Sequence, residues 1–144
     1  MKKNWQQHRN IVWSDVRDVI FQSDPSVWLE RNLAPSRLLG CSESLLVKDD
    51  PGGYNENWIN ESFAHDRDAR EIIWNNEIVC GGTIAGDAEA MRDLLQAIYT
   101  MTISNVNDQT ALQYLMRVSP FKEISRVPKN SEGCLLYTSD AADE

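Results

Sequence analysis

Short apolar runs alternate with amphipathic stretches along most of the chain. The apolar runs are bounded by polar or turn-forming residues, which is typical of strands. They predict strands at residues 10–14, 19–21, 38–41, 77–80 and 121–127. Loop residues predict a turn at 49–53, and a glycine-rich stretch at 81–86 predicts a turn between a strand and a helix. Residues 65–68 are polar and predict an exposed segment.

Helices are predicted where a capping side chain precedes apolar residues spaced three or four apart. Such patterns predict helices at 25–32, around Trp58, at 88–101 and at 108–117, with Asp24, Asn55, Asp87 and Asn107 as their N-caps. Because strands alternate with helices, we predict an α/β fold with a mostly parallel sheet flanked by helices, in one domain over residues 1–133.

Composition narrows the class of protein. The chain has 144 residues, of which 42% are hydrophobic and 25% charged, as in ordinary globular domains. It has no apolar run long enough to span a membrane and no signal peptide, so we expect a cytoplasmic protein. The net charge of −8 argues against a nucleic-acid partner. Cys41, Cys80 and Cys134 lack metal-site spacing, and the first two are interpreted as small buried hydrophobic residues.

An acidic cluster directly follows the first predicted strand. Asp15 and Asp18 lie three residues apart, with Arg17 between them. Carboxylates at the carboxyl end of a buried strand often hold a divalent ion against a nucleotide's phosphates, and a guanidinium suits phosphate. A turn-forming aspartate beside a solvated arginine–aspartate pair explains the same residues, and the spacing alone favours neither interpretation.

Other candidate positions each have a structural alternative. Glu43 follows a predicted strand, although a solvated surface glutamate is the favoured interpretation. The segment 81–83 would let a ligand approach the backbone, but a tight turn explains it equally well. Asp108 and Gln109 begin a helix, where an acid stabilises the first turn, so a purely capping role is favoured for Asp108.

Taken in order, these blocks resemble a family of glycosyltransferases with the GT-A (nucleotide-diphospho-sugar transferase) fold. Residues 15–25 are similar to the metal-motif segment of that family, and 42–51, 78–86 and 108–109 are similar to its following blocks. The resemblance covers about residues 10–129. It implies a partial Rossmann-like GT-A fold and the transfer of a sugar from a nucleotide-sugar donor to an acceptor of unknown identity.

The resemblance also implies roles for individual residues. Asp15 and Asp18 would bind a manganese or magnesium ion, which neutralises charge on the departing diphosphate. Contacts with the donor or acceptor would come from Arg17, Gly81, Gly82, Thr83 and Gln109, and Asp108 and Glu43 would be the catalytic carboxylates. Because the motif reads D-x-R-D rather than D-x-D, the ligating acid is left open.

The family pattern further implies that the chain is a fragment. Only about ten residues precede the metal motif, where GT-A proteins place most of their nucleotide-binding strands, and the late metal-binding histidine of many such enzymes has no counterpart. We therefore expect a piece of a metal-dependent glycosyltransferase that is inactive alone. Residues 134–144 resemble a translated sequencing adapter, as found in fragmentary metagenomic data, and predict a disordered tail.

A rival hypothesis comes from a different class of protein. The chain would be a small non-catalytic α/β domain that binds carbohydrate or protein, and its acids would only cap helices and meet solvent. Metal-dependent binding of a nucleoside diphosphate favours the transferase hypothesis, whereas sugar binding without metal favours the rival.

Overall fold

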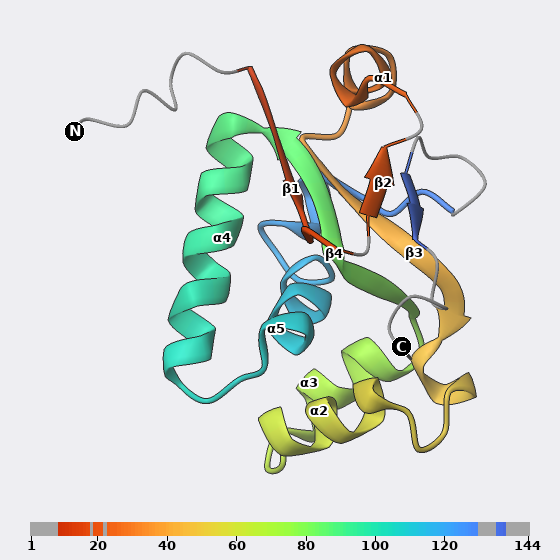
Figure 1. Cartoon of the computed structure of the whole chain (residues 1–144). Helices are drawn as coiled ribbons and strands as arrows, with labels where there is room; N and C mark the ends of the chain where they lie inside the picture. The colour runs from red at the N-terminus through yellow and green to blue at the C-terminus, as the bar shows by residue number, and fades with distance from the viewer. Residues whose placement is uncertain (1–8, 18, 22, 130–134, 138–144) are drawn as a thin grey trace.

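A computed structural model describes residues 9–17, 19–21, 23–129 and 135–137. Its centre is a four-stranded sheet in the order β1–β4–β3–β5 (Figure 1). These strands are β1 (Asn10–Ser14), β3 (Leu38–Leu46), β4 (Glu77–Asp87) and β5 (Ser125–Arg126), while β2 (Val19–Phe21) and β6 (Leu135–Tyr137) pair separately. The helices are α1 (Pro25–Asn32), α2 (Tyr54–Ser62), α3 (Arg67–Trp74), α4 (Ala88–Ile103) and α5 (Asp108–Leu115), with short 3-10 helices η2 (Val47–Asp49) and η3 (Lys122–Ile124).

The α/β class is confirmed, but the prediction of a mostly parallel sheet is wrong. The long strand β4 pairs antiparallel with both β1 and β3, and within the four-stranded sheet β3 and β5 alone run parallel. The alternation of elements suggested crossover helices, which return the chain in a parallel direction. Instead, α2 and α3 lie together at one end of the sheet, so the chain re-enters it antiparallel (Figure 1).

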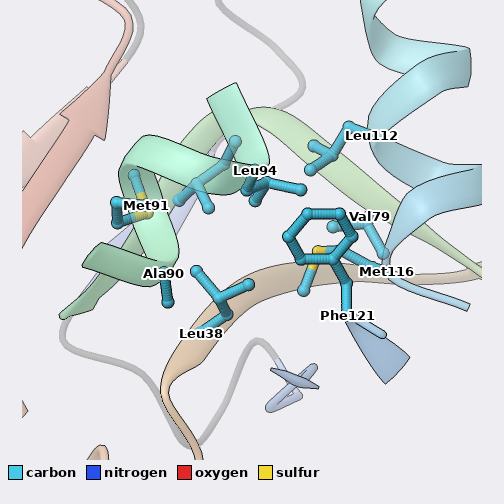
Figure 2. Close-up of a cluster of buried hydrophobic side chains, with 9 residues drawn as sticks. Leu38, Val79, Ala90, Met91, Leu94, Leu112, Met116 and Phe121 are labelled. Atoms are coloured by element: carbon cyan, nitrogen blue, oxygen red, sulfur yellow. The ribbon is translucent and has the colours of Figure 1, made fainter. Parts of the chain in front are cut away.

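Helices cover the sheet on both faces. The main core lies between the sheet and the pair α4 and α5, where Leu38, Val79, Met91 and Leu94 are buried together (Figure 2). On the other face, Leu29 of α1 packs on neighbouring residues of β3 and β4. A third cluster at the α2–α3 end joins these two helices to η2 and to the start of β4. The apolar residues that recur at helical spacing in the sequence are therefore buried against the sheet.

The predicted N-caps of three helices are confirmed. Asp24, Asp87 and Asn107 each accept a hydrogen bond from a backbone N–H in the first turn of α1, α4 and α5. Asp87 also receives Nε of Arg37 at 2.6 Å, so one carboxylate both caps α4 and ties it to the start of β3. The cap and the ion pair together fix where α4 leaves the sheet.

The sequence analysis was less accurate between β3 and β4. Gly53, not Asn55, is the N-cap of α2. The segment 65–68 is exposed, as predicted, but it also contains the N-cap and the first turn of α3, where Asp66 accepts a hydrogen bond from the backbone N–H of Ala69 at 2.9 Å. Only Ala69 and Ile73 of this short helix are buried, so its apolar repeat was too brief to identify.

Strand β4 corrects the predicted glycine turn at 81–86. The strand continues through this segment to Asp87. Its register against β3 jumps from Gly40↔Ile84 to Cys41↔Cys80, so residues 81–83 form a bulge opposite β3. Strand β3, expected to end at Cys41, continues to Leu46 and has its own bulge at 43–45. Of the strand expected at 121–127, Ser125–Arg126 is a strand and the residues before it form η3.

The C-terminal segment 134–144 was expected to be a disordered tail. Three of its residues instead form β6, which pairs antiparallel with β2. Residues 134 and 138–144 lie outside the described residues. Among the described helices, none combines the length and apolar character that crossing a membrane would require.

Candidate functional site

The two bulges, at 43–45 of β3 and 81–83 of β4, lie close together beside the carboxyl end of β1. Just two paired positions, Cys41↔Cys80 and Ser42↔Val79, separate them in the ladder. On the other edge of β4, the backbone N–H of Asp15 donates to the carbonyl of Gly82 at 2.9 Å. Three predicted site segments, distant in sequence, therefore meet where the strands are least regular, as is frequent next to active sites.

Asp15 lies over the backbone of Gly82. A Cβ at position 82 would stand 2.7 Å from Oδ2 of Asp15 and 3.5 Å from Sγ of Cys80. The glycine at 82 thus leaves room for the Asp15 carboxylate to lie against β4, and any larger residue there would displace this side chain. The Asp15 side chain itself is exposed, which leaves its carboxylate accessible to a ligand.

Gly81 is covered from α5. A Cβ at this position would overlap Oε1 of Gln109. The Nε2 group of Gln109 donates to the carbonyl of Val79 at 2.6 Å. Gln109 thereby holds the bulge against α5, which is a positioning role that the sequence analysis did not foresee. Thr83, the last residue of the bulge, is buried and pairs with Ser14 of β1.

Glu43 is half-buried, which corrects the favoured interpretation of a solvated surface residue. Burial raises the pKa of its carboxyl group, and the nearby charge of Asp50 raises that pKa further. The bulge around Glu43 is held by Ser42, whose Oγ accepts from the backbone N–H of Ser44 at 2.8 Å and donates to Glu77. Ser44 has φ of 59°, in the left-handed region. A half-buried carboxyl group with a raised pKa suits proton transfer.

The pKa of the Cys80 thiol is affected by burial and by charges from several strands. Burial raises its pKa to about 12, and a hydrogen bond with the backbone of Gly82 acts in the opposite direction. The charges of Glu43, Cys41 and Asp15 raise this pKa further. Asp15 and Glu43 therefore lie within electrostatic range of one buried atom, although they come from different strands.

Other predicted site residues are exposed or lie outside the described residues. Arg17 is exposed, and Asp108 is exposed at the start of α5, where its Oδ1 accepts from the backbone N–H of Gln109 at 2.8 Å. That contact agrees with the capping interpretation of Asp108. Asp18 lies outside the described residues.

A divalent cation would find oxygen ligands of suitable chemistry here. Asp15 and Glu43 are both carboxylates, which manganese and magnesium prefer. Within the part of the chain that the structure describes, however, no group of three or more His, Cys, Asp or Glu residues is arranged to hold a metal ion. Metal binding by Asp15 and Asp18 therefore stays a prediction.

A separate pocket of about 320 Å³ lies between α2 and α3. Its lining includes Trp74, Arg67, Arg70 and Asn60, and none of the predicted site residues. Sequence patterns do not predict this pocket, because the apolar repeat of α3 is too short to indicate a helix. An aromatic face beside arginine and amide side chains is a common lining for polar ligands.

Comparisons with known proteins add no family to this picture. No protein-family model matches the chain, and no curated protein is significantly similar to it.

Proposed function

We propose that the chain carries part of the substrate site of a metal-dependent glycosyltransferase that uses a nucleotide-sugar donor. The observation that supports this proposal is that Asp15 lies against the glycine bulge of β4, while Glu43 stands in the neighbouring bulge of β3 and both carboxylates act on Cys80. Those three segments belong to three of the four blocks on which the family resemblance rests, and they are far apart in sequence. An arrangement of solvated caps would not require them to meet.

Each residue has a role that its surroundings support. Asp15 is the exposed carboxylate that would hold the divalent ion with Asp18, and the ion would supply charge neutralisation at the diphosphate. Glu43 is a better candidate for proton transfer than Asp108, because burial already raises the pKa of Glu43 while Asp108 binds the backbone of its own helix. Gly82 allows the Asp15 carboxylate to lie close against the backbone of β4.

Isothermal titration calorimetry of the 144-residue chain tests the proposal. UDP and GDP are titrated with manganese present and then with manganese removed by a chelator. We expect binding of at least one of the two nucleotides with manganese and none without it. In the variant Asp15→Asn this binding is weakened, because a neutral amide oxygen attracts a divalent cation less strongly than a carboxylate does.

The matched control is Glu61→Gln, which neutralises an exposed carboxylate on α2. It removes the same charge as Asp15→Asn, so it should bind the nucleotide as the unmodified chain does. Equal binding by Asp15→Asn and the unmodified chain would refute the role of Asp15. Absence of nucleotide binding at every manganese concentration would refute the donor site in this chain.

One observation favours the rival, a non-catalytic carbohydrate-binding domain. The pocket between α2 and α3 combines the half-buried ring of Trp74 with Arg67, Arg70 and Asn60. Aromatic faces and planar polar groups suit the apolar and hydroxyl surfaces of a sugar. Saccharide binding that needs no metal and is weakened by Arg70→Ala, but unaffected by Asp15→Asn, would favour this alternative.

A further inference from the structure

Two cysteines that are 39 positions apart in sequence face each other across the central sheet. Cys41 of β3 and Cys80 of β4 are direct partners in the antiparallel register, and both are present as thiols. Directly opposed residues of antiparallel strands project their side chains to the same face of the sheet. The effect of Cys41 on the electrostatics of Cys80 is consistent with this closeness.

The spacing of opposed strand positions suits a disulfide. Opposed Cα atoms in antiparallel strands stand about 4.5 or 5.5 Å apart, and disulfides span Cα distances of about 4.4 to 6.8 Å. The Cβ atoms of opposed residues are about 4.5 to 5.5 Å apart, whereas a disulfide needs about 3.5 to 4.5 Å. Bond formation therefore requires a contraction of roughly 1 Å between the two strands.

The local structure makes that contraction feasible. A register shift lies on each side of the short paired segment Cys41–Ser42 opposite Val79–Cys80. The bulges at 43–45 and 81–83 interrupt the ladder, so a small approach of the strands here does not propagate along regular pairs. The two thiols stand in the least regular part of an otherwise long antiparallel pair.

We propose that Cys41 and Cys80 form a reversible redox pair that closes into a disulfide when the chain meets a hydroperoxide. The thiolate of Cys41 attacks the outer oxygen of the hydroperoxide, the O–O bond breaks, and Cys41 becomes a sulfenic acid while an alcohol leaves. The sulfur of Cys80 then attacks that sulfenic acid as it loses its proton, the S–O bond breaks, and the departing hydroxide takes up this proton, so a disulfide and water form. Two thiols are oxidised, and one hydroperoxide is reduced to an alcohol and water.

The order of attack follows from the surroundings of the two sulfurs. Cys41 is half-buried, whereas Cys80 is 2% exposed. Because the thiol of Cys80 is buried, a hydroperoxide reaches Cys41 more readily, and access to the sulfur is one determinant of thiol reactivity. Cys41 is therefore the residue that reacts first, and Cys80 resolves the sulfenic acid.

The disulfide would lie between the segments that form the candidate site. Residue Glu43 follows Cys41 by two positions, and Gly81 and Gly82 directly follow Cys80. Joining the two strands here would restrain both bulges at once. The redox proposal does not depend on the proposed transferase function, because its test measures thiols and not nucleotide binding.

The test uses the full chain carrying Cys134→Ser, so that Cys41 and Cys80 are its remaining thiols. The folded protein is treated with hydrogen peroxide, unfolded, and labelled with a maleimide for mass spectrometry. We expect both thiols to be lost together, with a mass decrease of two hydrogens, a crosslinked peptide pair containing Cys41 and Cys80, and full recovery with dithiothreitol. The yield should not depend on protein concentration, because the bond forms within one chain.

Two further variants in the same background test the order of events. Cys80→Ser should accumulate a Cys41 sulfenic acid that dimedone traps, and Cys41→Ser should lose its thiol at least about tenfold more slowly. The proposal is overturned if both thiols survive peroxide in the folded chain, if crosslinks join different chains, or if Cys41 oxidises further without a crosslink. Equal rates of thiol loss in Cys80→Ser and Cys41→Ser would overturn the assigned order of attack.

Discussion

The carboxylate of Asp87 has two structural duties that substitution can separate. Its Oδ1 accepts from the backbone N–H groups of Glu89 and Ala90, at 3.1 and 2.8 Å, and so caps α4. Its Oδ2 accepts a hydrogen bond from Nε of Arg37 at 2.6 Å, and its Oδ1 also accepts one from Nη2 of Arg37 at 3.0 Å. Asparagine is as good an N-cap as aspartate but carries no charge, whereas alanine supplies neither group. Asp87→Asn therefore removes the ion pair alone, and Asp87→Ala removes both.

The expected magnitudes follow from the geometry. Loss of an N-cap costs about 1 kcal/mol. The Arg37 side chain is 42% exposed and that of Asp87 is 27% exposed, so solvent screening limits the ion pair to about 0.5 kcal/mol. We expect Asp87→Asn to lower the free energy of unfolding by roughly 0.5 kcal/mol and Asp87→Ala by roughly 1.5 kcal/mol.

Urea unfolding at pH 7, followed by circular dichroism, measures both differences. Desolvation raises the pKa of Asp87, but the hydrogen bond from Arg37 and those from the backbone of α4 outweigh it, so the net pKa is lowered. A lowered pKa adds stability above the unfolded-state pKa of about 4 and loses it as the pH falls through the folded-state pKa. The cost of Asp87→Asn should therefore shrink in acid.

Two outcomes would contradict the roles assigned to Asp87. If Asp87→Asn lowers the free energy of unfolding as much as Asp87→Ala does, the N-cap adds no stability beyond that of the ion pair. A matched control, Arg37→Gln, removes the cation while keeping the cap, so it should cost about as much as Asp87→Asn, apart from the second contact of Arg37 with Glu89 at 2.9 Å. In the double variant Asp87→Asn/Arg37→Gln, a loss of unfolding free energy equal to the sum of the two single losses would show that the two side chains do not interact, and would refute the ion pair.

Two further predictions concern the candidate site. Burial and the charge of Asp50 raise the pKa of Glu43, so ionisation of this carboxyl group opposes folding above its unfolded-state pKa. Glu43→Gln should therefore melt at a higher temperature than the unmodified chain at pH 7, and at an equal temperature near pH 4. A lower melting temperature of Glu43→Gln at pH 7 would contradict this. Gln109→Ala should lower the free energy of unfolding by about 1 kcal/mol in urea, since the carbonyl of Val79 loses its donor, and no change would show that Gln109 does not hold the bulge.

Local chemistry in the sequence was sufficient to locate many elements. The N-cap at Asp87 and the repeat of apolar residues after it predicted α4 almost to its end, because both signals act within a few turns of one helix. The strand at 10–14 and the helix at 25–32 were also predicted with their observed bounds. The candidate acids Asp15 and Glu43 were identified because each follows an apolar run, which is a local pattern as well.

Long-range pairing decided what these residues do. Whether β4 runs parallel or antiparallel to β3 depends on where α2 and α3 pack, and no local pattern encodes that choice. The glycines at 81 and 82 suit a turn or a bulge equally well, and the register against β3 selects the bulge. The same register places Cys80 opposite Cys41, which the sequence alone presents as two isolated apolar residues. Sequence thus determined the local elements, and only the tertiary structure determined which of their side chains meet.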